Sequence, residues 1–308
     1  MNPSLSIVIP VYQSEKNLPS LVEALQAQLT QMDALFEVIL VNDGSRDSSW
    51  NVIELLCRKY PWVRASNLLR NYGQHNALLC GIRMARYDII VTMDDDHQHP
   101  PNMIPKLVQE ILNGMDVVYG VPQKKEHGFW RNLVTALAKL ALRFAAGISM
   151  AGDVSAFRAF RTPLRSAFEN YSGAFVSIDV LLAWGARHYK TIPVVHHARK
   201  EGASNYTLRR LIKHFVNMVT GFSIWPLRFV SLIGFFCTLL GFSVLATAIY
   251  LSVVQQSGNF AWFIAAMISL FAGAQLFALG IIGEYLACIH FRNMGKPAYV
   301  VAQKLNDD

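Results

Sequence analysis

The sequence contains little cysteine. Its 308 residues include four cysteines, scattered at Cys57, Cys80, Cys237 and Cys288 without a Cys-x-x-Cys pair. Neither a disulfide framework nor a zinc knuckle is therefore expected. The first residues also lack the pattern of a secretory signal. These absences indicate a reducing, cytosolic compartment for the polar part of the chain.

Charge is also scarce, and acidic residues are outnumbered. Charged residues make up 16% of the chain, with 28 Lys and Arg against 21 Asp and Glu, while apolar residues make up 53%. A basic chain can bind nucleic acid, but low charge together with many apolar residues favours a membrane-associated protein. We therefore expect membrane lipid, and no nucleic acid, among its partners.

Two stretches carry no charge at all. They cover about 26 residues over 229–254 and about 24 over 260–283, and about 20 apolar residues cross a bilayer. A short polar turn separates them, which predicts a transmembrane hairpin over 228–290. Arg228 precedes the hairpin and Arg292 follows it, so both termini are predicted to be cytoplasmic. A buried helical hairpin in a soluble core is the alternative.

Two basic, amphipathic stretches precede this hairpin. Residues 130–146 and 206–227 mix Arg and Lys with apolar residues at near-helical spacing. Helices of this kind lie in the headgroup plane and attract anionic lipid, although each stretch could also be an ordinary surface helix. The predicted organisation is a cytosolic domain over 1–205, a juxtamembrane helix, the hairpin and a cytosolic tail over 291–308.

The first 120 residues alternate strand and helix patterns. Strands are expected at 5–10, 37–41, 64–68 and 87–93, with helices between them at 18–31, 48–60 and 76–86. This rhythm predicts an α/β fold with a mostly parallel sheet and helices on both faces. In such sheets, ligands bind beyond the carboxyl ends of the strands.

Polar clusters follow four of these strands. They are Pro10-Val11-Tyr12, Asn42-Asp43-Gly44-Ser45, Asn71-Tyr72-Gly73 and Asp94-Asp95-Asp96. Three carboxylates at the end of a buried strand repel one another unless a cation neutralises them. Mg²⁺ or Mn²⁺ is the natural cofactor, since these ions prefer carboxylate oxygens and leave positions for substrate phosphates. The alternative is an acidic run that only solvates the strand end, but its expected proximity to Asp43 and Tyr12, which suit a pyrimidine base, favours a nucleotide site.

Histidines near the acidic run raise the alternative of zinc. His97 and His99 have suitable ligand chemistry, but His-x-His on an irregular loop is weak support. His196 and His197 are adjacent on an expected strand and should therefore face opposite sides.

Taken together, the motifs resemble the inverting, metal-dependent glycosyltransferases of family 2, which have the Rossmann-like GT-A fold. The match is close to the branch that uses polyisoprenyl phosphates as acceptors, and it covers nearly the whole chain. The motifs that carry the resemblance lie at 7–12, 41–45, 70–75, 93–101, 192–199 and 199–206.

The resemblance implies a set of site residues. Asp94, Asp96 and Gln98 would bind the metal. Asp153 and Asp96 would be catalytic, with Asp153 as a base, a positioning carboxylate or merely a helix cap, ahead of an Arg-rich helix at 157–161. The nucleotide sugar would be bound by Pro10, Val11, Tyr12, Glu15, Asp43, Asn71, Asp94 and Asp95. The acceptor phosphate would be bound by Arg131, Arg199 and Ser204, although either Arg could equally be a surface residue.

The implied reaction moves a sugar from a nucleotide sugar, with a preference for uridine, to undecaprenyl phosphate at the bacterial inner membrane. Asp95 stands where the family usually has Ala, and His97 where Leu is usual, which leaves the donor sugar open. A homo-oligomer is also left open.

Three other classes are weighed against this reaction. A membrane scaffold or transport component would bind the sugar nucleotide without turnover. A processive polysaccharide synthase would carry a Gln-x-x-Arg-Trp motif, which the sequence lacks. A nucleotidyltransferase would need a glycine-rich phosphate loop, which residues 10–20 do not contain.

Overall fold

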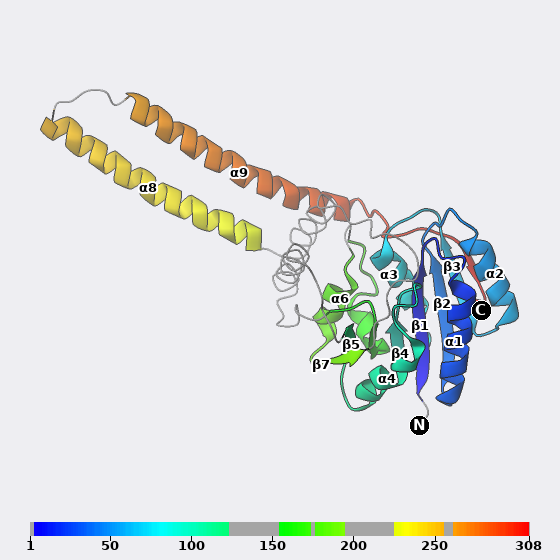
Figure 1. Ribbon diagram of the computed structural model, residues 1–308. Coiled ribbons are helices and arrows are strands. Elements are labelled where there is room, and N and C mark those ends of the chain that lie inside the picture. The colour runs from blue at the N-terminus through cyan, green and yellow to red at the C-terminus, as the bar shows by residue number, and fades with distance from the viewer. Residues whose placement is uncertain (1–2, 123–153, 174–175, 195–224, 256–260, 308) are drawn as a thin grey trace.

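The computed structural model describes residues 3–122, 154–173, 176–194, 225–255 and 261–307 (Figure 1). The interfacial helix expected at 130–146 lies outside these residues, as do His196, His197 and residues 206–224 of the helix expected at 206–227, whose last three residues are described.

The N-terminal part folds into the alternating strands and helices that its sequence predicts. The strands are β1 (Ser4–Val11), β2 (Leu35–Asn42), β3 (Val63–Leu68) and β4 (Ile89–Thr92). The helices between them are α1 (Leu18–Gln31), α2 (Ser49–Lys59) and α3 (Gln74–Met84). These four strands are parallel and adjacent in the order β4-β1-β2-β3, so their carboxyl ends share one edge of the sheet.

The complete sheet is mixed and mostly parallel, as the sequence predicts: among the described strands, six run in one direction and β6 and β8 run in the other. Beyond β4 it continues through β6 (Arg158–Arg161), β5 (Val117–Pro122) and β7 (Tyr189–Val194), and β8 (Val301–Leu305) lies beside β3. β6 runs antiparallel to both β4 and β5, and β8 antiparallel to β3, while β5 and β7 are parallel. The expected α/β fold with a mostly parallel sheet is thus confirmed, and the two antiparallel strands are the part that the sequence does not predict.

Helices cover both faces of the sheet. Because side chains alternate along a strand, Ile7 and Ile9 pack beneath α1, α2 and α4 (Ile104–Leu112), while Val8 packs beneath α3 and α6 (Ile178–Gly185). With both faces buried, the central strands are apolar almost continuously, as strands covered by helices on both sides are.

Residues 158–161 form the strand β6, and Phe157 directly before it is not helical, so the Arg-rich helix expected at 157–161 is wrong. β6 lies between β4 and β5, where Phe157, Arg158 and Phe160 are all buried. The guanidinium of Arg158 forms an ion pair with Asp179 in the first turn of α6. This segment, whose two Arg residues suggest a helix, therefore buries one of its charges in the sheet with an acidic partner.

The last described residues return to this sheet. β8 extends the sheet beyond β3, and Asp307 then forms an ion pair with Arg64 of β3. Arg64 also pairs with the buried Glu37 of β2, at 2.7 Å. The sequence predicts only a cytosolic tail over 291–308, so this strand adds to the expected domain.

Two long helices run side by side away from the sheet (Figure 1). They are α8 (Trp225–Gln255) and α9 (Ala261–Asn293). Among the described residues, one stretch, Leu270–Ala287 in α9, is long and apolar enough to cross a membrane by length and composition. Leu227–Ser243 in α8 is apolar but shorter. The predicted hairpin of two spans is therefore not confirmed.

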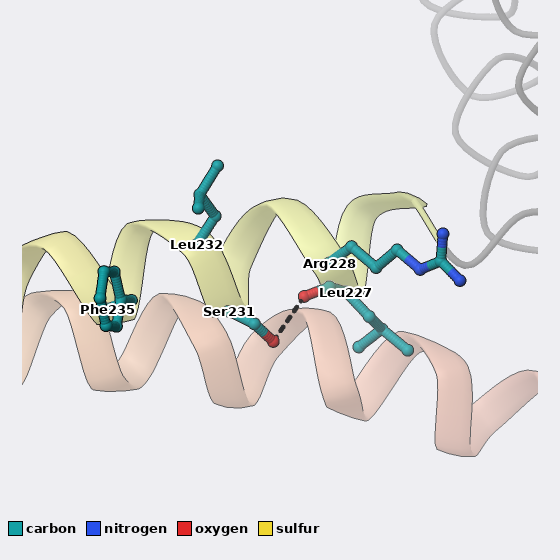
Figure 2. Close-up of a pocket in the computed structure, with 5 residues that line it drawn as sticks. All are labelled: Leu227, Arg228, Ser231, Leu232 and Phe235. Carbon is teal, nitrogen blue, oxygen red and sulfur yellow. Dashed lines mark hydrogen bonds between the residues drawn. The ribbon is translucent and has the colours of Figure 1, made fainter.

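The first turns of α8 combine one cation with apolar side chains (Figure 2). Leu227, Arg228, Ser231, Leu232 and Phe235 line an open hollow of about 620 Å³. Ser231 Oγ donates a hydrogen bond to the Leu227 carbonyl at 3.0 Å, which satisfies the hydroxyl within the helix. The Arg228 side chain extends back toward the start of the helix, as cationic side chains do where an apolar segment meets water.

Candidate active site

The loop after β1 is held by the side chains of other loops. Four consecutive backbone N–H groups, those of residues 12–15, donate to side-chain oxygens. The acceptors are, in order, Asp95 Oδ2 (3.1 Å), Ser45 Oγ (3.0 Å), Ser49 Oγ (2.9 Å) and Asp47 Oδ2 (3.4 Å). Gln13 adopts a φ of 56°, a left-handed conformation uncommon outside glycine. Tyr12 is 44% exposed, so a fixed backbone presents an accessible ring.

Asp43, directly after β2, organises the loop after β3. Its buried carboxylate accepts hydrogen bonds from the backbone N–H groups of Tyr72 (2.7 Å) and Gly73 (2.9 Å). Burial raises the pKa of this carboxyl, although the two hydrogen bonds oppose the rise. The next residue, Gly44, has a φ of 61°, and a Cβ there would lie 2.4 Å from the carbonyl carbon of Arg70. Only glycine allows the two loops to approach this closely.

The three consecutive carboxylates after β4 have different partners. Asp94 Oδ1 accepts a hydrogen bond from Gln74 Nε2 at 2.6 Å, and Asp96 Oδ1 accepts one from the backbone N–H of Gln98 at 3.1 Å. Asp95 is directed instead toward the loop after β1, and its burial raises the pKa of its carboxyl. The hydrogen bonds described for the three carboxylates thus go to three different parts of the structure.

Neither histidine of this loop joins a metal cluster within the described part of the chain. His97 Nε2 lies 2.9 Å from Ser20 Oγ and 3.1 Å from the carbonyl oxygen of Asn17, at the start of α1. His99 is buried and stacks on Phe157, with the ring centroids 5.2 Å apart. Over these residues, no three His, Cys, Asp or Glu side chains form a group that could hold a metal ion. The structure therefore offers the zinc alternative no support at these positions.

The donor atoms after β4 do suit a hard cation. Asp94, Asp96 and Gln98 lie on one short loop, and each is partly exposed. Mg²⁺ is commonly held by one or two carboxylates, with substrate phosphates and water completing its coordination, and carboxylate and carbonyl oxygens suit Mn²⁺ as well. Two carboxylates and one amide oxygen therefore fit either ion when a diphosphate binds beside them.

The other predicted site residues are dispersed around this edge. Pro10 and Val11 are buried in β1, and Asn71 is exposed on the loop after β3. Glu15 Oε2 accepts the backbone N–H of Ser48 at 2.9 Å, so in this structure Glu15 holds the segment that begins α2. Four predicted residues lie outside the described ranges, namely Arg131, Asp153, Arg199 and Ser204.

Arg158 is a residue of this region that the sequence does not reveal. Its Nε donates to Thr92 Oγ1 at 3.1 Å, at the end of β4 and two residues before Asp94. The only hint in the sequence is an arginine flanked by Phe157 and Ala159 in an apolar run, and a helix surface explains that pattern as well.

The sheet order and the four loops at one edge define an α/β protein of the GT-A class. Solved structures support this class. Glucosyl-3-phosphoglycerate synthase from Mycobacterium tuberculosis, in complex with Mn²⁺, uridine diphosphate and phosphoglyceric acid, aligns with a TM-score of 0.51 at 20% identity, over 71% of this chain and 76% of that one. Mannosyl-3-phosphoglycerate synthase from Rubrobacter xylanophilus aligns with a TM-score of 0.51 at 17% identity, over 70% and 72%.

The chain belongs to glycosyl transferase family 2, whose family model matches residues 6–168, and it is a glycosyltransferase. The undecaprenyl-phosphate 4-deoxy-4-formamido-L-arabinose transferase of Pseudomonas aeruginosa (strain LESB58) is 34% identical over 304 residues, which cover 96% of this chain and 89% of the relative. The enzyme of the same name from Pseudomonas syringae pv. syringae (strain B728a) is 33% identical over 302 residues, with the same coverage. The resemblance seen in the motifs is thereby confirmed.

Proposed function

We propose that this glycosyltransferase moves a sugar from a uridine diphosphate sugar to undecaprenyl phosphate, with inversion at the anomeric carbon. The observation that carries the proposal is the meeting of four loops at one sheet edge, with an exposed Tyr12, a buried Asp43 and the acidic run side by side. The names of the relatives support the acceptor. A bound uridine diphosphate and Mn²⁺ in a structure of the same fold support the donor.

The donor would bind with its base near Tyr12 and Asp43. The exposed ring of Tyr12 offers a face for stacking. Asp43 fixes the loop that carries Asn71, so one side of the site for the ribose and base would already be ordered before the donor binds. A preorganised site lowers the entropic cost of binding.

The diphosphate would lie against Asp94, Asp96 and Gln98. Mg²⁺ or Mn²⁺ held by these residues would neutralise the charge that develops on the departing nucleoside diphosphate. Asp96 and Asp94 would hold the ion at a fixed place, while Gln74 orients the Asp94 carboxylate through its 2.6 Å hydrogen bond.

The acceptor needs little activation. A phosphate monoester has a second pKa of about 6 and is largely ionised at neutral pH, so its oxygen can attack the anomeric carbon without a strong base. Arg131, Arg199 and Ser204 would position this phosphate, and Asp153 would act as a base or as a positioning carboxylate.

The place of β8 supports a hairpin that crosses the membrane twice. β8 follows α9 in the chain, yet it pairs with β3 in the same sheet as the N-terminal strands (Figure 1). A chain that leaves this sheet, crosses a bilayer and returns to the same sheet must cross an even number of times. We therefore propose that α8 and α9 both span the membrane, with the sheet domain and both termini in the cytoplasm.

The proposal is tested with the full-length chain in detergent. Undecaprenyl phosphate, Mg²⁺ or Mn²⁺ and a panel of nucleotide sugars are incubated with the enzyme, and the sugar phospholipid is measured by mass spectrometry. We expect one uridine diphosphate sugar to give product, together with release of uridine diphosphate. Binding of donors without release of nucleoside diphosphate would favour a binding-only scaffold instead.

Two variants of matched chemistry accompany this assay. Asp96→Ala should abolish turnover while the thermal unfolding of the protein is preserved. Asp88→Ala, which removes a carboxylate at the opposite end of β4, should leave turnover near that of the wild type. Full activity of Asp96→Ala would exclude the metal assignment.

A further inference from the structure

Asp95 differs from its two acidic neighbours in what it contacts. One oxygen, Oδ2, accepts two hydrogen bonds, from the backbone N–H of Tyr12 at 3.1 Å and from Ser14 Oγ at 2.5 Å. Both donors belong to the loop after β1, whereas Asp95 itself belongs to the loop after β4. A single oxygen atom therefore joins the two loops.

The loop after β1 depends on such contacts, since its N–H groups have left the sheet. The Ser14 side chain is nearly buried, and its backbone N–H is bound to Ser49 of α2. Gln13, between Tyr12 and Ser14, is in a left-handed conformation, which costs free energy and persists only where surrounding contacts impose it. Of the hydrogen bonds described above for the backbone of residues 12–15, the one to Asp95 comes from the loop after β4, and the others come from the segment 45–49.

We propose that Asp95 is a positioning residue, which sets the distance between Tyr12 and the carboxylates of Asp94 and Asp96 without itself contacting the donor or the metal. This inference rests on the proposed function. In that function, the base of the donor binds at Tyr12 and its diphosphate at Asp94 and Asp96, so the spacing of the two loops must match the length of the nucleotide. An alanine at position 95 would remove the link and leave Tyr12 without this restraint.

The test uses the fact that both hydrogen bonds end on the same oxygen. Asp95→Asn can place its one carbonyl oxygen there and keep both bonds, whereas Asp95→Ala cannot. We expect Asp95→Ala to raise the Kd for uridine diphosphate and the KM for the donor about tenfold, because the loop after β1 must then become ordered as the donor binds. We expect kcat to stay within about threefold, and Asp95→Asn to restore KM. A residue that contributes its charge to the metal would instead lose kcat in both variants.

A second measurement follows the loop itself. Amide hydrogen exchange at residues 12–14 of the full-length chain in detergent should be at least about tenfold faster in Asp95→Ala, because the loop opens more readily. Asp88→Ala is the matched control. Asp88 Oδ2 accepts a 2.5 Å hydrogen bond from Ser4 Oγ and so joins the same two strands at their other end. This variant should change neither the exchange of residues 12–14 nor the donor KM.

Two results would overturn the role of Asp95. One is unchanged exchange at residues 12–14 in Asp95→Ala, and the other is an Asp95→Asn variant as defective as Asp95→Ala. Failure of the proposed function looks different, because the wild-type chain would then release no nucleoside diphosphate with any donor. In that case the exchange measurement still decides whether Asp95 holds the loop.

Discussion

Arg158 in β6 and Asp179 in α6 form an ion pair next to the end of β4, the strand that leads into the acidic run. The Arg158 side chain is 2% exposed and that of Asp179 is 13% exposed, so each charge is compensated mainly by the other. Since Arg158 also contacts Thr92 of β4, the pair connects α6 to the strand that ends at the site.

Loss of Asp179 should therefore destabilise the protein strongly. Asp179→Ala would leave a buried guanidinium without its partner, at a cost of about 3–5 kcal/mol. The measurement is the free energy of unfolding of the full-length chain in denaturant. The more exposed pair of Lys190 and Glu110, at 2.8 Å, provides the control, because exposed ion pairs contribute little and Glu110→Ala should cost much less stability than Asp179→Ala. Equal losses in the two variants would contradict the prediction.

Gly44→Ala should weaken donor binding. The added Cβ would lie 2.4 Å from the backbone carbon of Arg70, so the loop after β3 must move. Gly114→Ala isolates this effect, because Gly114 also has a positive φ, of 102°, but a Cβ there would meet nothing within 4 Å. Both variants should lose about 1 kcal/mol or more of stability through backbone strain, while only Gly44→Ala should raise the KM for the donor. Titration calorimetry with uridine diphosphate checks the result.

Tyr12 should contribute to donor affinity through its ring rather than its hydroxyl. Stacking of a base on an aromatic side chain is worth about 1–3 kcal/mol by alanine substitution. Tyr12→Ala should therefore raise the donor KM about tenfold or more, and Tyr12→Phe should stay within about twofold. A Tyr12→Phe variant as weak as Tyr12→Ala would show that the hydroxyl carries the contact.

The docking of β8 should depend on pH through Asp307. Burial acts to raise the pKa of the Asp307 carboxyl, but hydrogen bonds from Lys304 and Arg64 outweigh it and hold the pKa below its usual value of 3.8. A carboxyl with a lowered pKa in the fold adds stability that is complete above its usual value and is lost as pH falls through the lowered value. Wild type should therefore melt at a higher temperature than Asp307→Asn at neutral pH, and this difference should shrink below pH 3.8. A difference that grows on acidification would refute the assignment.

The N-terminal half of the fold was predictable because its patterns are local. Each strand there is a short apolar run, and each helix carries an apolar face that packs on it. Local patterns do not predict β6 and β8. The segment Arg158–Arg161 is a strand only because β4 and β5 lie on either side of it, and β8 reads Val-Ala-Gln-Lys-Leu, with only its two end residues partly buried. The partner of β8 lies more than 200 residues earlier, and no local pattern encodes it.

The site was predictable in its position more than in its contacts. The carboxyl-end rule brings Tyr12, Asp43 and the acidic run together, because parallel neighbouring strands end at one edge. It does not determine which way each side chain turns. Asp95 and His97 follow one another in the loop with a single residue between them, yet one faces the loop after β1 and the other faces α1. Such directions depend on backbone angles, including the φ of 59° at His97, which the sequence does not display.

The position of β8 also orders the events of biosynthesis. The chain is made from its N-terminus, so β3 and its helices emerge long before β8 does. Until then, β3 presents an edge of unpaired N–H and C=O groups, the kind of edge that recruits other chains. That edge closes only when residues 301–305 arrive, after both long apolar helices have been synthesised. The sheet of this protein can therefore be completed only after α8 and α9 have been synthesised.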